Sequence, residues 1–334
     1  MVDKKVYIIA EAGVNHNGSL LLAKKLIDSA AESGADAVKF QSFVAECGIS
    51  KNAPKAKYQL KLTSKNESQI EMIRRLELSS NDHKELIDHC HKRKVDFLST
   101  ACDLDSVSLL GSLNQTMFKI ASCDIVNIPV IRAVAKFKKK VILSTGMASL
   151  GEVERAISEL RIHGTEDIVL LHCTTEYPCP VNEVNLLKIN TLRNAFHLSV
   201  GFSDHSQGIS AAIASISLGA VVIEKHFTLD RKMKGPDHKA SINPDELKEM
   251  VKSIREVEVA LGSPAFKPSP SEKLNLDVMR RKIVASSNIR KGEMFSLNNI
   301  GFKRAKGGVT PDYCDFVLGK IATQDYILDD EILI

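Results

Sequence analysis

The chain has 334 residues, of which 44% are hydrophobic and 26% are charged, so a disordered or fibrous chain is excluded. Lys and Arg number 45 against 41 Asp and Glu, and the net charge of +4 is too small to indicate a nucleic-acid partner. The apolar runs all fall short of the roughly 20 residues of a membrane span, and the apolar stretch that ends at Glu11 is too short for a signal-peptide core.

Short runs rich in β-branched residues alternate with amphipathic stretches. The runs predict strands at 6–12, 35–41, 96–101, 116–122, 141–145, 168–174, 197–203 and 220–226. Apolar periodicity predicts helices at 20–33, 128–138, 151–163, 185–195, 208–218 and 244–261. Strands that alternate with helices form a parallel sheet, and eight such units in about 260 residues match a (β/α)8 TIM barrel. The alternative is an open doubly wound sheet, whose usual G-x-G-x-x-G turn does not fit Gly13 and Gly18.

The barrel pattern ends near Gly262. The proline-rich segment 263–271 that follows has the composition of a stiff, extended linker. From residue 281 on, short apolar runs between Gly and Asn turns indicate a compact β-rich unit. We therefore expect a catalytic barrel at 1–262, a linker at 263–280 and a small β-rich domain at 281–334.

Polar residues follow every predicted strand. The active sites of barrels lie at the C-terminal strand ends. The polar residues at or just after those ends are Glu11, Lys39, Gln41, Ser99, Thr100, Lys119, Ser122, Asp124, Ser144, Thr175, Tyr177, Ser203, Asp204, His205, Glu224, Lys225 and His226. One charged residue at a strand end is often only solvated. Eight polar strand ends that converge on one mouth predict a binding site, because buried charge is costly unless it is paired or used.

Two histidines, His205 and His226, fall at equivalent depth on adjacent predicted strands. Imidazoles placed in this way can share one divalent ion. The alternative is that both are hydrogen-bonded core histidines, and spacing alone leaves both interpretations open.

Two lysines, Lys39 and Lys119, share the predicted mouth with the hydroxyls of Thr100, Ser122 and Ser144. Ammonium groups and hydroxyls suit the binding of a phosphate and a carboxylate. Each lysine could instead form an ion pair with a neighbouring carboxylate.

Three other features have less direct interpretations. Lys225 alternates with Glu224 and His226, so its side chain either faces the mouth or points into the helix layer. His83, His89 and His91 are expected on a solvated helix face. Cys102, Cys123, Cys173 and Cys179 are expected to be buried fillers. The odd count of seven cysteines, without CxxC, indicates free thiols and a cytoplasmic protein.

The segment 42–68 is unusually long for a connection after a strand. Long loops on the mouth side of a barrel often act as lids. Within it, residues 53–59 carry lysines and a tyrosine suited to contact with an anion or a sugar. An ordinary surface excursion is the alternative.

Several motifs, in the same order along the chain, resemble those of sialic acid synthases. They are the segments 10–18, 38–41, 142–147, 171–178, 201–205, 224–229 and 235–241. Segment 302–311 resembles the small antifreeze-like (SAF) domain of the same enzymes. The resemblance implies a TIM barrel followed by a SAF domain, and condensation of phosphoenolpyruvate with an N-acetylated hexosamine, with release of phosphate. It leaves open whether that sugar is N-acetylmannosamine or 2,4-diacetamido-2,4,6-trideoxymannose.

The resemblance also implies roles for particular residues. It implies a divalent metal, usually manganese, on His205 and His226. The implied phosphoenolpyruvate contacts are Lys39, Thr100, Lys119, Ser122, Ser144, Thr175 and Ser203. The implied sugar contacts are Gln41, Tyr177, Asp237 and Arg304, with Glu11 beside the reacting centre. Asp124 stands where the family has a candidate catalytic glutamate, and the family's Ser-Thr-Pro-Phe is Ser99–Cys102 here.

The resemblance further implies a domain-swapped homodimer, in which Arg304 of one chain reaches the barrel of the other. Two other functions stay open from the sequence. One is a Schiff-base aldolase that uses Lys119 or Lys225 as its nucleophile. The other is a carbohydrate-binding barrel without turnover.

Overall fold

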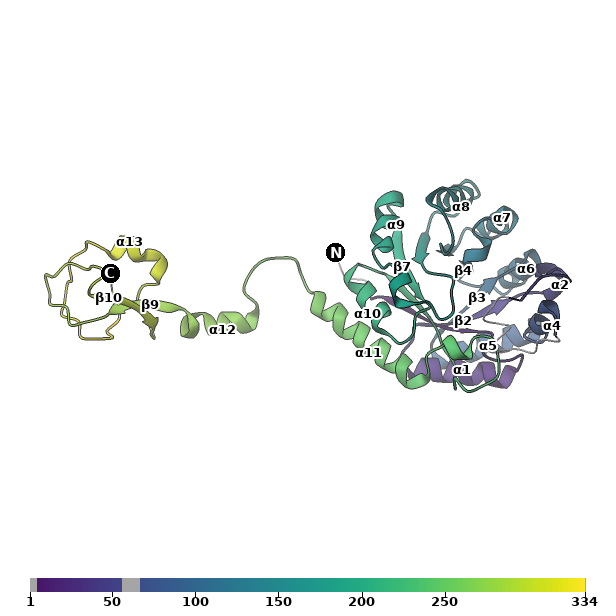
Figure 1. The fold of residues 1–334 in the computed structure, drawn as a ribbon, viewed down its shortest axis with the longest axis horizontal. Helices are drawn as coiled ribbons and strands as arrows, with labels where there is room; N and C mark the ends of the chain where they lie inside the picture. The colour runs from purple at the N-terminus through teal and green to yellow at the C-terminus, as the bar shows by residue number, and fades with distance from the viewer. Residues whose placement is uncertain (1–4, 56–66, 334) are drawn as a thin grey trace. The chain divides into compact units, whose positions relative to one another are not determined.

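The chain folds into two compact units, which meet in sequence at Gly262 and Ser263. The computed structural model describes residues 5–55 and 67–333. Figure 1 colours both units by position along the chain.

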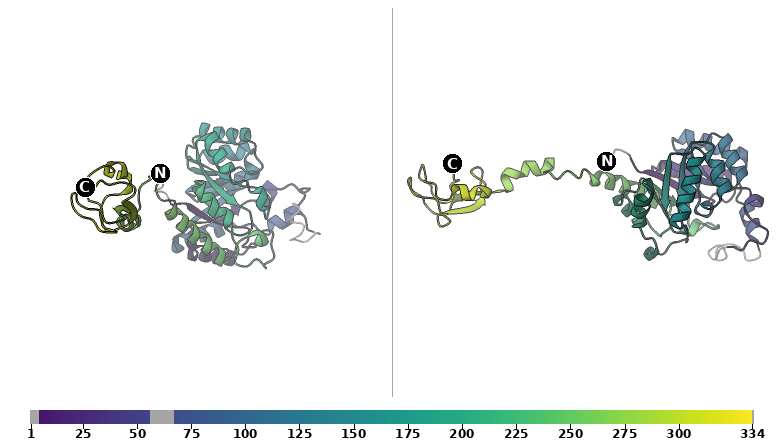
Figure 2. Two further views of the ribbon diagram at one scale, coloured as in Figure 1. Left: turned by 60° about the vertical axis from the view of Figure 1, so that its left-hand side comes forward. Right: turned by 90° about the horizontal axis from the view of Figure 1, so that it is seen from above.

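The first unit is a closed barrel of eight parallel strands, in which β8 pairs with β1 and closes the sheet. The strands are β1 (Tyr7–Gly13), β2 (Ala37–Ser42), β3 (Asp96–Ala101), β4 (Met117–Ile120), β5 (Lys140–Ser144), β6 (Ile168–His172), β7 (Ser199–Asp204) and β8 (Val222–His226). Each strand pairs with the next in sequence. Figures 1 and 2 show the barrel from three directions. The predicted (β/α)8 barrel is confirmed, and the open doubly wound sheet is excluded.

Helices surround the barrel on its outside (Figure 2). They are α1 (Leu20–Glu32), α5 (Ser80–Arg93), α6 (Leu104–Ser112), α7 (Ile128–Ala135), α8 (Leu150–Ile162), α9 (Lys188–Phe196), α10 (Ser210–Ser217) and α11 (Pro244–Leu261). Several begin with a capping box, as in Asn243 with Glu246 at the start of α11. Two short helices, α2 (Ala45–Gly48) and α4 (Gln69–Arg74), lie in the long connection between β2 and α5.

The strand alternation points every second side chain into the barrel. These inward side chains form an apolar floor and, above it, a polar mouth. The inward-facing residues of the floor form one buried apolar cluster: Ile9, Ala37, Leu98, Ile142, Val169, Leu171 and Val222. Two residues further along their strands stand Glu11, Lys39, Thr100, Ser144 and Glu224. The apolar layer therefore closes the barrel beneath a ring of polar side chains.

The second unit contains α12 (Pro270–Met279) and an antiparallel pair, β9 (Arg281–Ala285) with β10 (Ile300–Arg304). The 3-10 turn η4 (Pro311–Tyr313) and α13 (Cys314–Val317) follow. Its own buried cluster includes Ile283, Phe295, Val317 and Tyr326. Helix α12 occupies residues expected to belong to the linker, because Ser269 and Glu272 form a capping box around Pro270.

Two expectations about single residues are corrected. His83 is 1% exposed rather than solvated, because it shares the inward face of α5 with Leu86 and Cys90. Its ring is hydrogen-bonded to the Ser42 hydroxyl at 2.6 Å. Cys123 is exposed rather than a buried filler, whereas Cys173 and Cys179 are buried as predicted.

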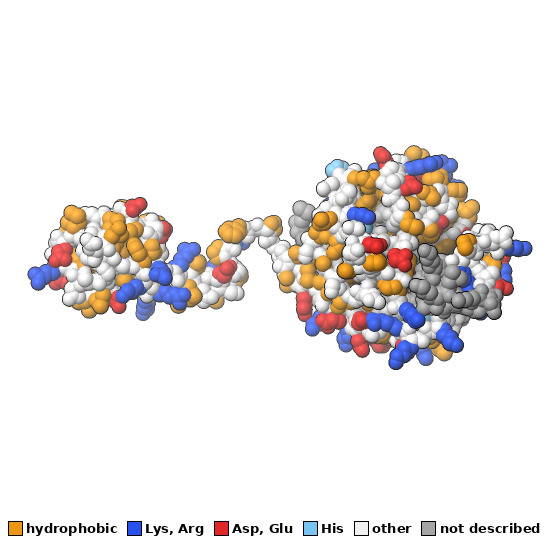
Figure 3. All heavy atoms as spheres, viewed as in Figure 1, with side chains coloured by type: hydrophobic (Ala, Val, Ile, Leu, Met, Phe, Trp, Pro, Cys, Tyr) orange, Lys and Arg blue, Asp and Glu red, His pale blue; other side chains and the backbone are white. Residues whose placement is uncertain are grey.

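The surface of the first unit carries acidic and basic side chains interspersed on the face drawn in Figure 3. No helix in the described parts of the chain has the length and apolar character needed to cross a membrane. Residues 56–66 lie outside the described residues, so the central part of the predicted lid 42–68, including residues 56–59, is not described. Its role as a lid stays a prediction.

Candidate active site

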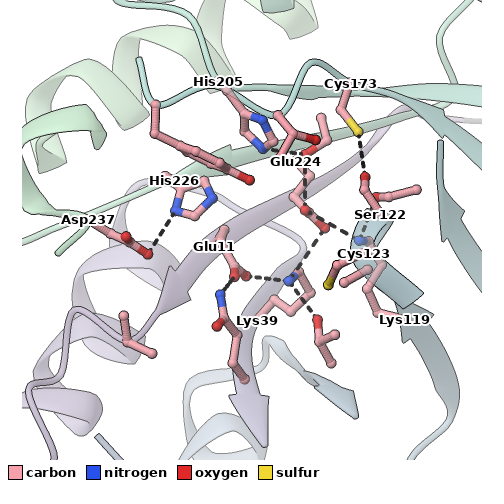
Figure 4. A pocket seen from close by; sticks show the side chains of 18 of the residues that line it. Glu11, Lys39, Lys119, Ser122, Cys123, Cys173, His205, Glu224, His226 and Asp237 are labelled. Carbon is pink, nitrogen blue, oxygen red and sulfur yellow. Dashed lines mark hydrogen bonds and ion pairs between the residues drawn. The ribbon is translucent and has the colours of Figure 1, made fainter. Parts of the chain in front are cut away.

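A cavity of about 290 Å³ opens at the C-terminal ends of the barrel strands. It brings together thirteen of the predicted site residues: Glu11, Lys39, Gln41, Thr100, Lys119, Ser122, Ser144, Thr175, Tyr177, Ser203, His205, His226 and Asp237. Figure 4 shows His226 and Asp237 on one side of Glu11, and Lys119 with Ser122 on the other.

The lysines and carboxylates of the pocket form one buried charge cluster. The Nζ atom of Lys39 lies 2.7 Å from Oε2 of Glu11 and 3.8 Å from Oε2 of Glu224. The Nζ atom of Lys119 lies 3.7 Å from Oε1 of Glu224. All four side chains are at most 5% exposed. The lysines are therefore ion-paired and also line the pocket, so both interpretations left open by the sequence apply.

Hydroxyl groups surround these ammonium groups. Lys39 Nζ donates to Thr100 Oγ1 at 3.0 Å, and Lys119 Nζ donates to Ser144 Oγ at 2.7 Å. Ser203 Oγ donates to Glu224 Oε1 at 3.1 Å. Together these groups offer two cations and several hydroxyls to an anionic ligand, in a place where few water molecules compete.

The two carboxylates of the cluster have opposite pKa shifts. Burial raises the pKa of Glu11 to about 7, against the lowering effect of the Lys39 ammonium. Burial also disfavours the charged form of Glu224, but the charges of Lys119 and Lys39 outweigh it and lower that pKa to about 2. At neutral pH, Glu224 is therefore an anion that holds the lysines, and Glu11 is poised to exchange a proton.

The two predicted metal-binding histidines face each other, with ring centroids 5.4 Å apart. Burial lowers the pKa of His205 to about 4, and burial together with the His205 charge lowers that of His226 well below its ordinary value. Both imidazoles are therefore neutral at pH 7, the form that binds a metal.

The hydrogen bonds of these rings fit a metal site. Nδ1 of His205 donates to the Thr174 carbonyl at 2.6 Å, which leaves Nε2 with its lone pair. Nδ1 of His226 is buried without a hydrogen-bond partner, and Oδ2 of Asp237 lies 3.8 Å from it. No group of three or more His, Cys, Asp or Glu side chains in the described ranges is arranged to hold a metal ion. Two imidazoles would thus need further ligands from water or substrate.

Two further residues lie on the same side of the pocket as the histidines. The Tyr177 ring lies against His205, with centroids 4.3 Å apart. Burial raises the pKa of the Asp237 carboxyl to about 6. An aromatic face and a carboxyl group beside the imidazoles suit contact with a polar, uncharged ligand such as a sugar.

Two other predicted site residues, Asp124 and Arg304, are not among the thirteen that line this pocket. Asp124 is buried in η1 (Ser122–Asp124), where it accepts a hydrogen bond from Asn127 Nδ2 at 2.9 Å. It is not among the described residues that line the cavity, although its neighbour Cys123 is. Arg304 ends β10 in the second unit and is exposed. Catalytic roles for both stay predictions.

Lys225 points away from the mouth, into the layer between strands and helices. Its Nζ lies 2.8 Å from Oδ2 of Asp204, and the two side chains are 1% and 0% exposed. It also donates to the Ser206 carbonyl at 2.6 Å. The strand alternation that places Glu224 and His226 inward places Lys225 outward, so it is not a nucleophile of this pocket.

Replacing Lys225 by methionine should therefore lower stability and spare turnover. Breaking a buried ion pair by removing one partner costs about 3–5 kcal/mol. We expect the free energy of unfolding, measured with urea, to fall by that amount. The folded fraction should still release phosphate at low temperature. The control is Lys252→Met, whose side chain is 65% exposed and whose ion pair is worth at most about 1 kcal/mol. Loss of turnover in a fully stable Lys225→Met variant would contradict this assignment.

Sequence reasoning did not assign a role to Glu224 or to the apolar part of the lining. Glu224 shares the inward strand positions with His226, so the period-two pattern could have placed it in the pocket. Val14, Ile73 and Pro236 also line the cavity. They lie in α4 and in the loops after β1 and β8, where the sequence pattern carries no comparable signal for side-chain direction.

Comparison with known proteins gives a consistent picture. The model of the NeuB family matches residues 26–265. The N,N'-diacetyllegionaminic acid synthase of Campylobacter jejuni is 53% identical over 332 residues, which cover 99% of this chain and 99% of that protein.

Two solved structures with sequence similarity each cover more than four fifths of this chain. The structure of a spore coat polysaccharide biosynthesis protein from Bacillus subtilis has a TM-score of 0.68 and 37% identity, covering 99% of this chain and 95% of that one. The structure of N-acetylneuraminic acid synthetase from Leptospira borgpetersenii has a TM-score of 0.72 and 33% identity, covering 82% of this chain and 91% of that one.

Proposed function

The chain belongs to the NeuB family, and from this premise we propose how its pocket joins phosphoenolpyruvate to an N-acetylated hexosamine. The chain is a nonulosonic acid synthase, a transferase whose reaction forms a carbon–carbon bond and releases phosphate. The observation that carries the proposal is the buried cluster of Lys39, Lys119 and Glu224 beside a pair of neutral histidines.

We propose that phosphoenolpyruvate occupies the half of the pocket between β2 and β5. Its phosphate and carboxylate would be bound by Lys39 and Lys119 and by the hydroxyls of Thr100, Ser122 and Ser144. The support is that these groups converge in a buried setting, where charge-assisted hydrogen bonds are strong. Ser203 in β7 and Thr175 after β6, which also line the cavity, would complete this set from the adjoining strands.

The sugar would lie on the other side, against Tyr177, Gln41 and Asp237. A divalent ion held by His205 and His226 would supply Lewis-acid chemistry at the sugar's carbonyl oxygen. The neutral state of both rings and the unpartnered Nδ1 of His226 support this assignment, and manganese is the metal that we propose. With both reactants held in one cavity, the condensation gains the advantage of proximity.

The reaction itself follows from the electron demand of the substrates. The methylene carbon of phosphoenolpyruvate attacks the aldehyde carbon, whose oxygen takes the electron pair of the broken π bond and then a proton. Positive charge develops at the carbon that bears the phosphate oxygen. Water adds to that carbon and loses a proton, and the resulting tetrahedral intermediate expels phosphate to leave a ketone. We propose that Glu11 accepts the water's proton, because its carboxylate faces the pocket and that of Asp124 does not.

This role of Glu11 predicts a pH dependence. The pKa of Glu11 is raised to about 7, so the carboxyl is protonated below that pH and cannot accept a proton. We expect kcat to fall as the pH falls through 7 and to level off above it. In Glu11→Gln, kcat should be low and the inflection should vanish, whereas Asp124→Asn should keep it. An inflection near pH 7 in Glu11→Gln would transfer the role to another group.

We also propose that the second unit is a SAF domain and that two chains pair head to tail. Arg304 would then reach the sugar in the partner's barrel, which its exposure at the end of β10 permits. Mixing His205→Ala with Arg304→Ala under subunit exchange should restore about a quarter of wild-type activity, because half of the random dimers carry one intact site. If both variants are inactive alone, recovery of nothing would place Arg304 on its own barrel, whereas full activity of Arg304→Ala alone would place Arg304 outside the mechanism.

A phosphate-release assay with phosphoenolpyruvate and each candidate sugar tests the function. Release that requires both reactants supports the synthase. A Schiff-base aldolase would instead trap substrate on borohydride treatment and would ignore chelators. Lys119 is the remaining candidate nucleophile for that reaction, since Lys225 faces the helix layer. Absence of any turnover would favour the carbohydrate-binding alternative.

A further inference from the structure

We propose, resting on the function proposed above, that Asn15 is a positioning residue for the metal side of the pocket. Asn15 lies in the loop after β1, is 2% exposed, and is not among the described residues that line the cavity. Its side-chain amide joins the two ends of the loop 227–241, which leaves β8 and carries Asp237. We call this segment the β8 loop. Asn15 therefore acts through the backbone of that loop and touches no reacting group.

The β8 loop is closed at its neck, directly beside one of the two histidines. It leaves the barrel after His226 and returns at Ile242, and Phe227 and Ile242 form a parallel bridge. The Ile242 amide donates to the His226 carbonyl at 2.9 Å, and the Thr228 amide donates to the Ile242 carbonyl at 2.9 Å. The position of the neck therefore bears directly on the backbone of His226.

The Asn15 amide binds both sides of this neck. Its Nδ2 donates to the Phe227 carbonyl at 2.8 Å and to Ser241 Oγ at 2.9 Å. Because Ser241 Oγ accepts this bond, its own hydrogen is free to donate, and it does so to the Asp237 carbonyl at 2.8 Å. The chain of hydrogen bonds therefore has one direction, from Asn15 through Ser241 to the backbone of Asp237.

The oxygen of the same amide gains nothing from this arrangement. Oδ1 of Asn15 is buried and has no hydrogen-bond partner in the described parts of the chain. An unpaired buried acceptor is costly, and leucine, which has the same branched shape, would avoid that cost. The two donated bonds are what asparagine supplies at this position and leucine does not.

The first of these bonds holds the backbone that carries His226. Phe227 follows His226 directly, and its amide donates to the Glu11 carbonyl at 2.9 Å. The Asn15 bond holds the carbonyl of the same residue. Phe227 is thus tied to the β1 segment at both of its polar backbone groups, which fixes the direction in which the His226 ring leaves β8.

The second bond holds Asp237. Inside the β8 loop, Thr228 Oγ1 and His238 Nδ1 lie 2.7 Å apart, so the loop is braced next to Asp237 as well as at its neck. Oδ2 of Asp237 lies 3.8 Å from Nδ1 of His226, and Figure 4 shows the two side chains facing each other. We infer that the Asn15 amide sets the place of this carboxyl group relative to the imidazole.

The test replaces Asn15 with leucine, which removes both donors and adds no charge. The probe is Mn²⁺ alone, and electron paramagnetic resonance of the free ion measures its binding without substrate. We expect the Kd for Mn²⁺ to rise by about 10–100-fold, the range for residues that orient metal ligands. Asn194→Leu, at an exposed position on α9, is the control and should leave this Kd unchanged.

A second ligand separates positioning from a general loss of structure. Lys39 and Lys119, assigned to phosphoenolpyruvate, lie on β2 and β4 and keep their hydroxyl contacts in Asn15→Leu. The Kd for phosphoenolpyruvate, measured by calorimetry, should therefore be unchanged in this variant. Equal losses of Mn²⁺ and phosphoenolpyruvate binding would show a damaged barrel and overturn the inference. Wild-type affinity for Mn²⁺ in folded Asn15→Leu would overturn it as well.

Ser241→Ala tests the second bond alone and decides the matter if Asn15→Leu does not fold. It removes the donor to the Asp237 carbonyl and leaves the Phe227 bond in place. We expect the KM of the sugar to rise by about 2–10-fold, the equivalent of one hydrogen bond, with an unchanged Kd for Mn²⁺. An unchanged KM would contradict the role of the chain. If the wild-type protein itself neither binds Mn²⁺ nor releases phosphate, the proposed function fails, whereas wild-type activity with unaltered variants removes only the role of Asn15.

Discussion

Lys119→Met should strongly lower sugar-dependent phosphate release while the barrel stays folded. The Lys119 ammonium lies 2.7 Å from Ser144 Oγ and 3.7 Å from Glu224, in the half of the pocket assigned to phosphoenolpyruvate. Removing one partner of a buried charged contact costs about 2–5 kcal/mol. At 1.4 kcal/mol per factor of ten, kcat/KM for phosphoenolpyruvate should fall by about 30- to 3,000-fold.

The matched control is Lys225→Met, since both lysines are buried and ion-paired at neighbouring depths of the barrel. The two variants should show opposite patterns, with lost turnover for Lys119 and lost stability for Lys225. Direct titration of phosphoenolpyruvate binding, by calorimetry, separates weak binding from unfolding. Normal phosphoenolpyruvate binding by Lys119→Met would remove this lysine from the anion site.

Chelation should abolish turnover, and added Mn²⁺ should restore it. The basis is the facing pair of neutral imidazoles, with their centroids 5.4 Å apart and Nδ1 of His226 unpartnered. Loss of Lewis-acid assistance is worth several kcal/mol, so activity should fall by about a thousandfold or more. His226→Ala should lose bound metal, measured by elemental analysis, and should not recover at ordinary metal concentrations.

The control for the histidine variant is His89→Ala, on the side of α5 that faces α1, where the ring pairs with Asp28 at 2.8 Å. It should keep both metal content and turnover. Full activity of the wild-type enzyme in excess chelator, with no metal bound, would end the metal assignment. Covalent trapping by borohydride under the same conditions would then point to Lys119 as a Schiff-base nucleophile.

Local signals explain why much of the fold was predictable. The predicted helix 244–261 coincides with α11, because Asn243, Pro244 and Glu246 mark its start and Gly262 its end. The same kind of signal at Ser269 and Glu272 marks α12, but the proline-rich composition around it predicts a linker. Composition describes a segment on average, whereas a capping box is made by individual residues.

The site was predictable where strand alternation alone sets the side-chain direction. Lys39, Thr100, His205 and His226 follow that rule and meet in the cavity. Asp124 does not, because it lies in a 3-10 turn after β4, where the hydrogen bond from Asn127 sets its direction. The role of Glu224 depends on lysines from β2 and β4, and only the closed barrel brings these strands to opposite sides of its carboxylate.

The reaction run in water labelled with oxygen-18 tests the central claim most directly, since the account requires water to attack the enol carbon rather than phosphorus. Phosphate released from phosphoenolpyruvate and the sugar should then contain no label, because its bridging oxygen comes from phosphoenolpyruvate. The keto group of the nine-carbon product should carry the label when it is reduced at once to prevent exchange. Label in the phosphate, or phosphate release without the sugar, would show simple hydrolysis and contradict the account.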